Sequence, residues 1–71
     1  MMNESFEARL RIILATKGMS QADLAQRLDV PASTLNGWVR GRYPAPDGLH
    51  GLALRIESAL GLNVGEMGSW S

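Results

Sequence analysis

Cysteine is absent from this chain of 71 residues, and histidine occurs once, as His50. Without cysteine there is neither a disulfide nor a thiolate metal site to stabilise a fold, and one imidazole does not make a metal centre. No apolar run approaches the roughly 18 residues of a membrane span, and no signal-peptide pattern opens the sequence. We therefore expect one soluble cytoplasmic domain over residues 1–71, with no metal, no cofactor and no small-molecule substrate.

An excess of positive charge is also missing, because seven Lys and Arg residues balance seven Asp and Glu residues. A nucleic-acid-binding protein is usually basic, so the distribution of the charges matters more than their sum. No acidic residue lies between Asp29 and Asp47, and Arg40 and Arg42 fall within that stretch. The stretch is therefore locally positive on a neutral protein, which predicts modest non-specific affinity for nucleic acid.

Catalytic patterns are lacking as well. Ser20, Ser33 and Ser58 have no histidine at a suggestive spacing, and no G-x-S-x-G elbow occurs. No strand is predicted that a glycine-rich phosphate loop would follow. The sequence therefore predicts a protein that is not an enzyme.

The most informative stretch runs from Ser20 to Gly41 and predicts two short helices separated by a tight turn. Ser20 is expected to cap the first helix, with Asp23 reaching back to complete a capping box. Pro31 breaks that helix and is expected in the first turn of the second, where a missing N–H costs little. Gly41 suits a left-handed cap at the end of the second helix.

Helical spacing of apolar residues predicts two further helices, one on each side of this pair. The first covers residues 4–17, capped by Asn3 or Ser5, with Asn3 favoured. The last runs from about residue 48 to 60 and is expected to be capped by Asp47. Glycines interrupt the remaining residues, so we expect a core over about residues 4–62 and a weakly ordered tail over residues 63–71.

The central stretch resembles the helix-turn-helix of the Cro/C1-type (XRE-like) DNA-binding family of phage repressors and small bacterial regulators. The resemblance covers about residues 5–62 and implies an all-α, compact bundle of four to five helices, like the DNA-binding domain of lambda repressor. The residues that carry it are Ser20-Gln21-Ala22, Leu24-Ala25, Leu28, Val30, Ser33-Thr34-Leu35, Trp38, Arg40-Gly41, Ile56, Ala59 and Leu60-Gly61.

The chain departs from the family pattern at four places. Asp29 stands where glycine is usual in the turn, and aspartate can adopt the left-handed conformation at modest cost. Pro31 replaces a common Ser or Thr cap, and Val39 replaces a frequent Glu. The segment from residue 41 to 56 is about two residues longer than usual, which leaves the geometry of its loop undetermined.

On the second helix of the pair, Leu35, Trp38 and Val39 are expected to face inward. The opposite side then presents a set of small or polar residues to base edges in the major groove. Asn36 suits adenine, Ser33 can donate or accept, and Ala32 suits a thymine methyl group. The predicted base contacts are Ala32, Ser33, Asn36 and Gly37.

Gly37 is unusual, because glycine inside a helix costs about 0.5–1 kcal/mol relative to alanine. Either the helix lies close against the DNA there, or a helix held by Trp38 tolerates the glycine. Arg40 and Arg42 are expected to contact phosphates, with a hydroxyl contact from Tyr43. By the resemblance, Gln21 is placed to touch a phosphate and support the second helix.

Trp70 lies in the glycine-broken tail, with two equally supported roles. It either folds back over the core or joins a dimer contact. The candidate dimer contacts are Leu54, Leu62, Val64, Met67 and Trp70.

We therefore expect a transcriptional regulator of double-stranded DNA, a repressor of phage or bacterial type. It would act as a homodimer, at least on DNA, with two protomers in major grooves about 34 Å apart. The alternative is a coactivator- or antitoxin-like protein-interaction module with little DNA binding. Operator sequence and regulated genes are beyond the sequence.

Overall fold

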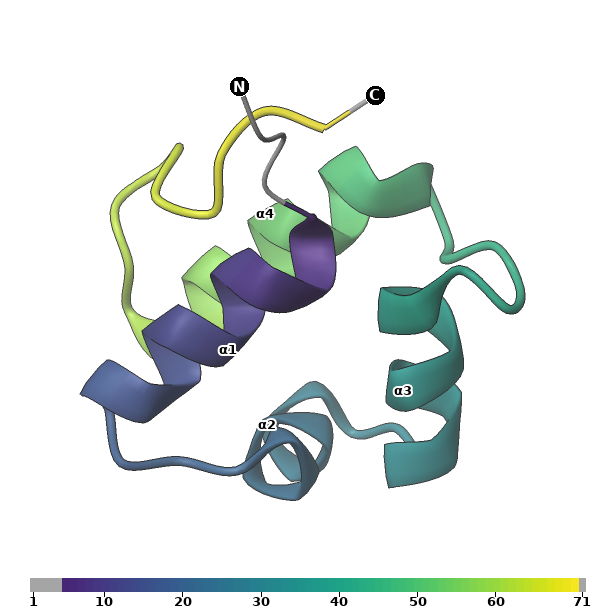
Figure 1. Ribbon diagram of the computed structural model, residues 1–71, viewed down its shortest axis with the longest axis horizontal. Helices are drawn as coiled ribbons and strands as arrows, with labels where there is room; N and C mark the ends of the chain where they lie inside the picture. Colours follow the sequence, from purple (N-terminus) through teal and green to yellow (C-terminus); the bar gives the residue numbers. More distant parts are fainter. Residues whose placement is uncertain (1–4, 71) are drawn as a thin grey trace.

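The computed structural model describes residues 5–70 and folds them into four α-helices. In chain order these are α1 (Phe6–Thr16), α2 (Gln21–Leu28), α3 (Ala32–Arg40) and α4 (Gly48–Leu60). No strand occurs among the described residues. Figure 1 shows α1 in front of α4, with α2 and α3 as the helix-turn-helix pair beside them. The predicted all-α fold with a helix-turn-helix is confirmed.

Local signals set the start of α1 and of α2. The Ser5 hydroxyl accepts a hydrogen bond from the Ala8 N–H at 3.0 Å, so Ser5 is the cap of α1. The favoured alternative, Asn3, lies outside the described residues. At α2, the Ser20 hydroxyl accepts from the Asp23 N–H at 3.0 Å, and the Ser20 N–H donates to the Asp23 carboxylate at 2.9 Å. The predicted capping box is therefore present.

The turn between α2 and α3 also follows the sequence closely. Asp29 adopts the left-handed conformation with φ of 60° and ends α2, as glycine does in the family pattern. Pro31 differs slightly from expectation, because it is the extended N-cap residue of α3 rather than part of its first turn. Its fixed φ of −60° suits that position, where no N–H is required.

The core is made by one stripe from each helix together with Ala45 of the loop after α3 and Met67 near the C-terminus. A fully buried aliphatic side chain contributes about 1.5–3 kcal/mol, so a few such residues decide the stability of a chain this small. The largest fully buried side chains are Leu10, Leu24, Leu35, Leu52, Ile56 and Met67.

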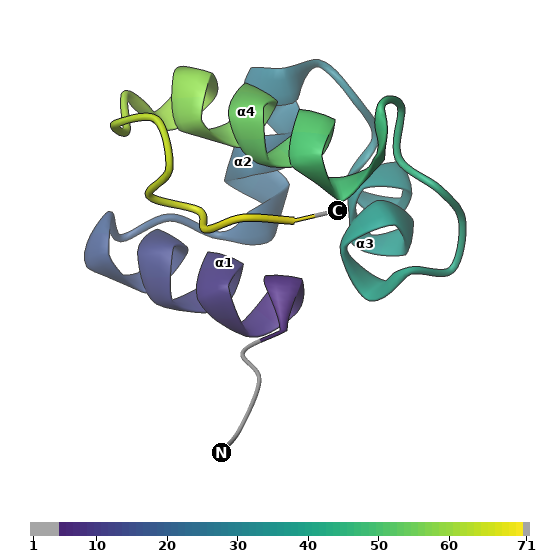
Figure 2. The same ribbon diagram turned by 90° about the horizontal axis from the view of Figure 1, so that it is seen from above.

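Residues 62–70, here called the tail, pack onto the core instead of fraying after one turn. Figure 2 shows the tail, in yellow, running between α1 and α4. Met67 is 0% exposed, and the Trp70 ring meets the Phe6 ring edge-on at a centroid distance of 5.1 Å. The Trp70 indole N–H donates to the Met67 carbonyl at 2.7 Å. Trp70 thus folds back over the core, one of its two expected roles.

A buried carboxylate anchors the tail. Glu57 of α4 is 3% exposed, and its Oε2 accepts hydrogen bonds from the N–H groups of Gly65 and Met67, each at 2.9 Å. From α1, the Arg9 guanidinium donates to the Glu66 carbonyl at 2.9 Å. Gly65 and Gly68, which suggested fraying, instead supply positive φ values of 97° and 95° for the turns that these contacts need.

The start of α4 needs a further correction. Asp47 occupies the N-cap position, but its side chain forms no capping hydrogen bond. The reason is the backbone, because Asp47 has a left-handed φ of 61° where a capping residue is normally extended.

No helix within residues 5–70 has the length and apolar character needed to cross a membrane.

Candidate nucleic-acid interface

The side of α3 that faces the core is the side predicted from the sequence. Leu35 and Val39 are buried, at 0% and 5% exposure, and Trp38 is half-buried. The Arg55 guanidinium lies over the Trp38 ring at 6.0 Å from its centroid, which covers part of the remaining aromatic surface. On the other side of α3, Ala32 in the first turn is exposed, so a ligand can reach this part of the helix.

Asn36 and Gln21, predicted to contact a base and a phosphate, lie against each other. The Asn36 side-chain amide donates to the Gln21 side-chain carbonyl at 3.2 Å. This bond ties the start of α2 to the middle of α3 and limits the rotamers of both side chains. It uses one of the two Asn36 amide hydrogens, so the other hydrogen and the carbonyl oxygen can still form a bidentate contact with adenine.

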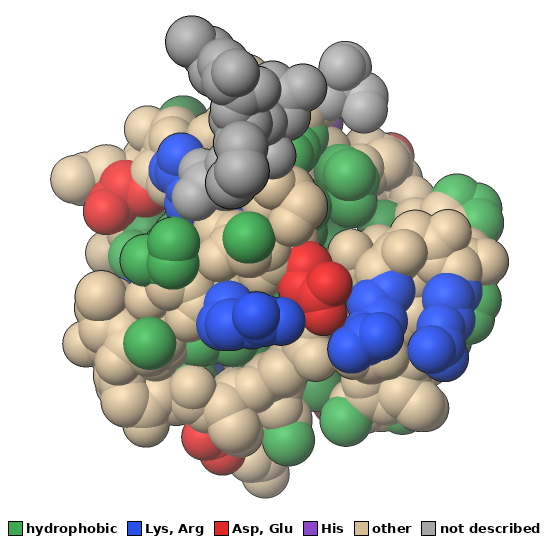
Figure 3. Space-filling model, in the orientation of Figure 1, with side chains coloured by type: hydrophobic (Ala, Val, Ile, Leu, Met, Phe, Trp, Pro, Cys, Tyr) green, Lys and Arg blue, Asp and Glu red, His purple; other side chains and the backbone are tan. Residues whose placement is uncertain are grey.

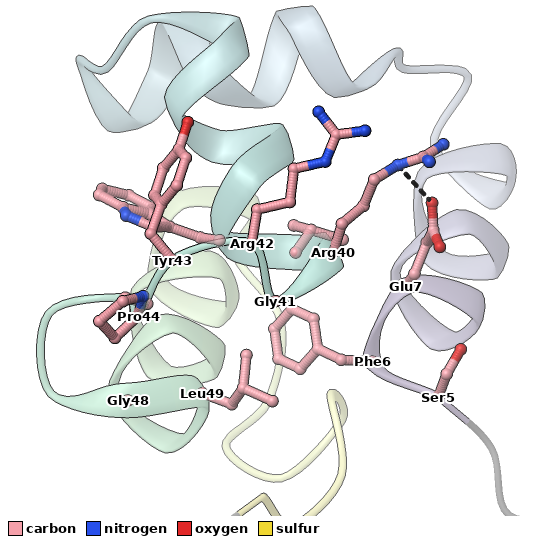
Figure 4. A pocket seen from close by; sticks show the side chains of 13 residues that line it. Ser5, Phe6, Glu7, Arg40, Gly41, Arg42, Tyr43, Pro44, Gly48 and Leu49 are labelled. Carbon is pink, nitrogen blue, oxygen red and sulfur yellow. Dashed lines mark ion pairs between the residues drawn. The ribbon is translucent and has the colours of Figure 1, made fainter.

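The structure gives a reason for glycine at position 37 that neither sequence-based explanation included. The Tyr43 ring lies along α3, as Figure 4 shows, and a Cβ atom at Gly37 would overlap it. The Tyr43 hydroxyl donates to the Ser33 carbonyl at 3.1 Å. Ser33 and Gly37 are one helical turn apart, so the ring follows the outer surface of α3.

Gly37 is therefore buried by this protein's own tyrosine, and DNA at this point of α3 would meet Tyr43 first. Tyr43 is 45% exposed, which leaves part of the ring available to a partner. The position of Tyr43 follows from Gly41, whose left-handed φ of 75° turns the chain back after α3.

The basic residues near the end of α3 share their surface with one acid. The Glu7 carboxylate lies 3.4 Å from Arg40 Nε and 3.8 Å from Arg11 Nη2. Arg42 follows Arg40 by two residues, and its side chain forms no hydrogen bond or ion pair with residues 5–70. We call Arg11, Glu7, Arg40 and Arg42 the charged strip, and Figure 3 shows acidic atoms between basic ones on this face.

Two grooves border Arg40. The larger, about 850 Å³, lies between the start of α1, the end of α3, the loop that follows it and the start of α4, and Trp38 is among its lining residues. Figure 4 shows Phe6 and Leu49 lining it. The smaller, about 380 Å³, brings three predicted DNA contacts from α2 and α3 together with two charged residues of α1. These five are Gln21, Asn36, Arg40, Glu7 and Arg11.

Glu7 was not predicted to belong to the interface, and neither was its ion pair with Arg11. Their i, i+4 spacing on a predicted helix was the available signal, since such a pair shares one helix face. What the sequence lacked was the orientation of α1 toward α3.

Within the described part of the chain, no three His, Cys, Asp or Glu residues gather where a metal ion could bind.

The candidate dimer contacts divide into two groups. Met67 is fully buried inside the protomer and offers no surface to a partner, whereas Trp70 packs on Phe6 and stays half-buried. Val64 and Leu54 are exposed, at 86% and 42%, and Leu62 is half-buried. A dimer contact through Leu54, Leu62, Val64 and Trp70 stays a prediction.

Comparison with known families gives one match. The model of a family described as helix-turn-helix matches residues 10–67, well over half of the chain. The match includes α2, α3, α4, most of α1 and the part of the tail that ends at Met67. No curated protein and no solved structure matches the chain.

Proposed function

This chain belongs to the Cro/C1-type (XRE-like) helix-turn-helix family of DNA-binding transcription regulators, and on that premise we propose that it is a sequence-specific repressor of phage or bacterial type. One observation supports the proposal most strongly. Gln21, Asn36 and Arg40 line one groove, in which the Gln21 side chain accepts a hydrogen bond from the Asn36 amide.

The proposed mechanism is occlusion of a promoter. The N-terminal half of α3 enters the major groove, where Asn36 and Ser33 meet base edges. Arg40 and Arg42 contact phosphates on one flank, and Gln21 contacts one near the start of α2. A homodimer places two copies of α3 about 34 Å apart on a two-fold site.

A second function is favoured by the charge of the molecule. The net charge is zero, and Glu7 neutralises part of the charged strip. A protein-interaction module, coactivator- or antitoxin-like, would use the same fold with little DNA binding.

Titration of a fluorescent mixed-sequence duplex by fluorescence polarisation separates the two functions. A DNA-binding regulator binds at 50 mM salt and much more weakly at 200 mM, because phosphate contacts release counterions. Absence of binding at high micromolar protein and 50 mM salt would favour the interaction module instead.

Two variants then test the assignment of contacts on a duplex obtained by selection. Arg42→Ala should weaken binding to all duplexes alike and lower the salt slope by about 0.9. Asn36→Ala should cost about 1–3 kcal/mol on the selected duplex and much less on mixed sequence. Arg27→Ala is the matched control for charge, since Arg27 is exposed on α2 outside the charged strip. An unchanged selected consensus for Asn36→Ala would refute its role in base recognition.

A further inference from the structure

Glu7 is an acid within the surface assigned to DNA. Its carboxylate forms two ion pairs, to Arg40 Nε at 3.4 Å and to Arg11 at 3.8 Å. The side chains remain partly open to solvent, with 36% of Glu7 and 48% of Arg40 exposed. A phosphate that binds this surface therefore meets a carboxylate beside the arginines.

The backbone gives this carboxylate a defined place. Glu7 lies in the first turn of α1, two residues after the Ser5 cap, where a negative charge is favourable near the helix N-terminus. From there its side chain reaches across to the last residue of α3. Figure 4 shows Glu7 on the Nε side of Arg40, while the terminal nitrogens of Arg40 extend past the carboxylate.

This geometry leaves the terminal nitrogens of Arg40 able to bind a phosphate, but only close to a like charge. Two like charges 4–8 Å apart in water repel enough to weaken binding about two- to fivefold. The ion pairs themselves add little to the stability of the fold, because surface pairs of this kind are screened by solvent.

We infer that Glu7 is an internal counter-ion that competes with DNA phosphate for Arg40 and Arg11. The inference rests on the proposed function, because it requires the charged strip to face DNA. In the free protein Glu7 already balances part of the positive charge of Arg40 and Arg11. Binding to the DNA backbone is thereby weakened for every sequence, and base contacts through Asn36 and Ser33 carry a larger share of the affinity.

Glu7→Gln tests this inference, because it removes the charge and keeps the shape. The variant should bind mixed-sequence duplex about two- to fivefold more tightly than the parent at 50 mM salt. Its salt slope should be steeper by up to about 0.9, since one arginine no longer has an internal partner to exchange. The melting temperature, followed by circular dichroism, should change by no more than a few degrees.

Glu66→Gln is the matched control. It makes the same chemical change in the tail, and the new amide oxygen can still accept the hydrogen bond from the Asn63 N–H. This control should leave DNA affinity nearly unchanged, because the lost charge is outside the charged strip. In a protein that already carries Arg40→Ala, Glu7→Gln should raise DNA affinity much less than it does in the parent, because the competition acts mainly through Arg40.

The outcomes separate this inference from the proposed function. Equal or weaker binding by a folded Glu7→Gln variant, with salt-dependent binding by the parent, overturns the competition and leaves DNA binding intact. An equal gain from Glu66→Gln overturns it too, because total charge would then explain the effect. If neither the parent nor any variant binds duplex, the proposed function fails, and the competition fails with it.

Discussion

The turn between α2 and α3 and the tail are both short irregular segments, yet different contacts hold them. In the turn, the stabilising contacts join residues a few positions apart: left-handed Asp29 and the next residue, Val30, donate their N–H groups to carbonyls in the last two turns of α2. The tail has local hydrogen bonds too, but Phe6 and Arg9 of α1, far along the chain, and Glu57 of α4 join it to the core. Local contacts make a conformation readable from sequence, whereas distant contacts make it depend on the assembled fold.

Met67→Ala gives the largest expected effect, because it removes the buried centre of the tail. Truncating a fully buried methionine costs about 2–5 kcal/mol, through lost burial and the cavity left behind. In a domain of this size, each kcal/mol lowers the melting temperature by about 4–8 °C. Thermal unfolding followed by circular dichroism measures the change.

Val64→Ala is the control for that experiment. Val64 lies in the same tail but is 86% exposed, so the variant should stay within about 0.5 kcal/mol of the parent. Equal stability of Met67→Ala and the parent would show that the tail contributes nothing to the core.

The same division explains what the sequence could predict. The caps at Ser20 and Gly41, and the left-handed turn at Asp29, follow from residue types within one helical turn. The inner face of α3 follows from helical periodicity. These features predicted two helices joined by a tight turn, and the resemblance to the family then identified them as a helix-turn-helix with α3 as the predicted recognition helix.

The features that sequence reasoning missed join distant residues. The pair Glu7–Arg40 requires the angle between α1 and α3, and periodicity carries no information about that angle. The role of Tyr43 requires the path of the loop after Gly41, which is longer than the family form. The glycines in the tail suggested disorder from the sequence. In the structure their positive φ values serve turns, which can be recognised only once the tail is packed on the core.

A double-mutant cycle between Gly37 and Tyr43 tests a distant contact within the interface. Alanine at position 37 gains about 0.5–1 kcal/mol of helix propensity but displaces the Tyr43 ring. Displacement also removes the hydroxyl bond to Ser33, which is worth about 0.5–1.5 kcal/mol. We therefore expect Gly37→Ala to leave the parent unchanged or less stable, and to stabilise the Tyr43→Ala background.

Urea unfolding of the four proteins measures the coupling, which should be about 0.5–1.5 kcal/mol. Tyr43→Phe serves as a further background, because it keeps the ring and removes only the hydroxyl. If Gly37→Ala stabilises the parent and the Tyr43→Ala variant equally, the ring does not require glycine there. Tolerance of glycine by a helix held through Trp38 would then be the better explanation.

The smallest expected effect concerns the local region and depends on pH. Two hydrogen bonds with Ser20 lower the pKa of Asp23 from its usual value of 3.8. The bond from the Ser20 backbone N–H has the larger effect, and the bond with the Ser20 hydroxyl has the smaller one. A carboxyl whose pKa is lower in the folded state stabilises that state above its unfolded pKa, and the contribution disappears as pH falls through the folded pKa. The advantage of the parent over Asp23→Asn in urea unfolding should therefore be full at pH 6 and smaller at pH 3. An equal difference at both pH values would mean that the capping box does not depend on the charge of Asp23.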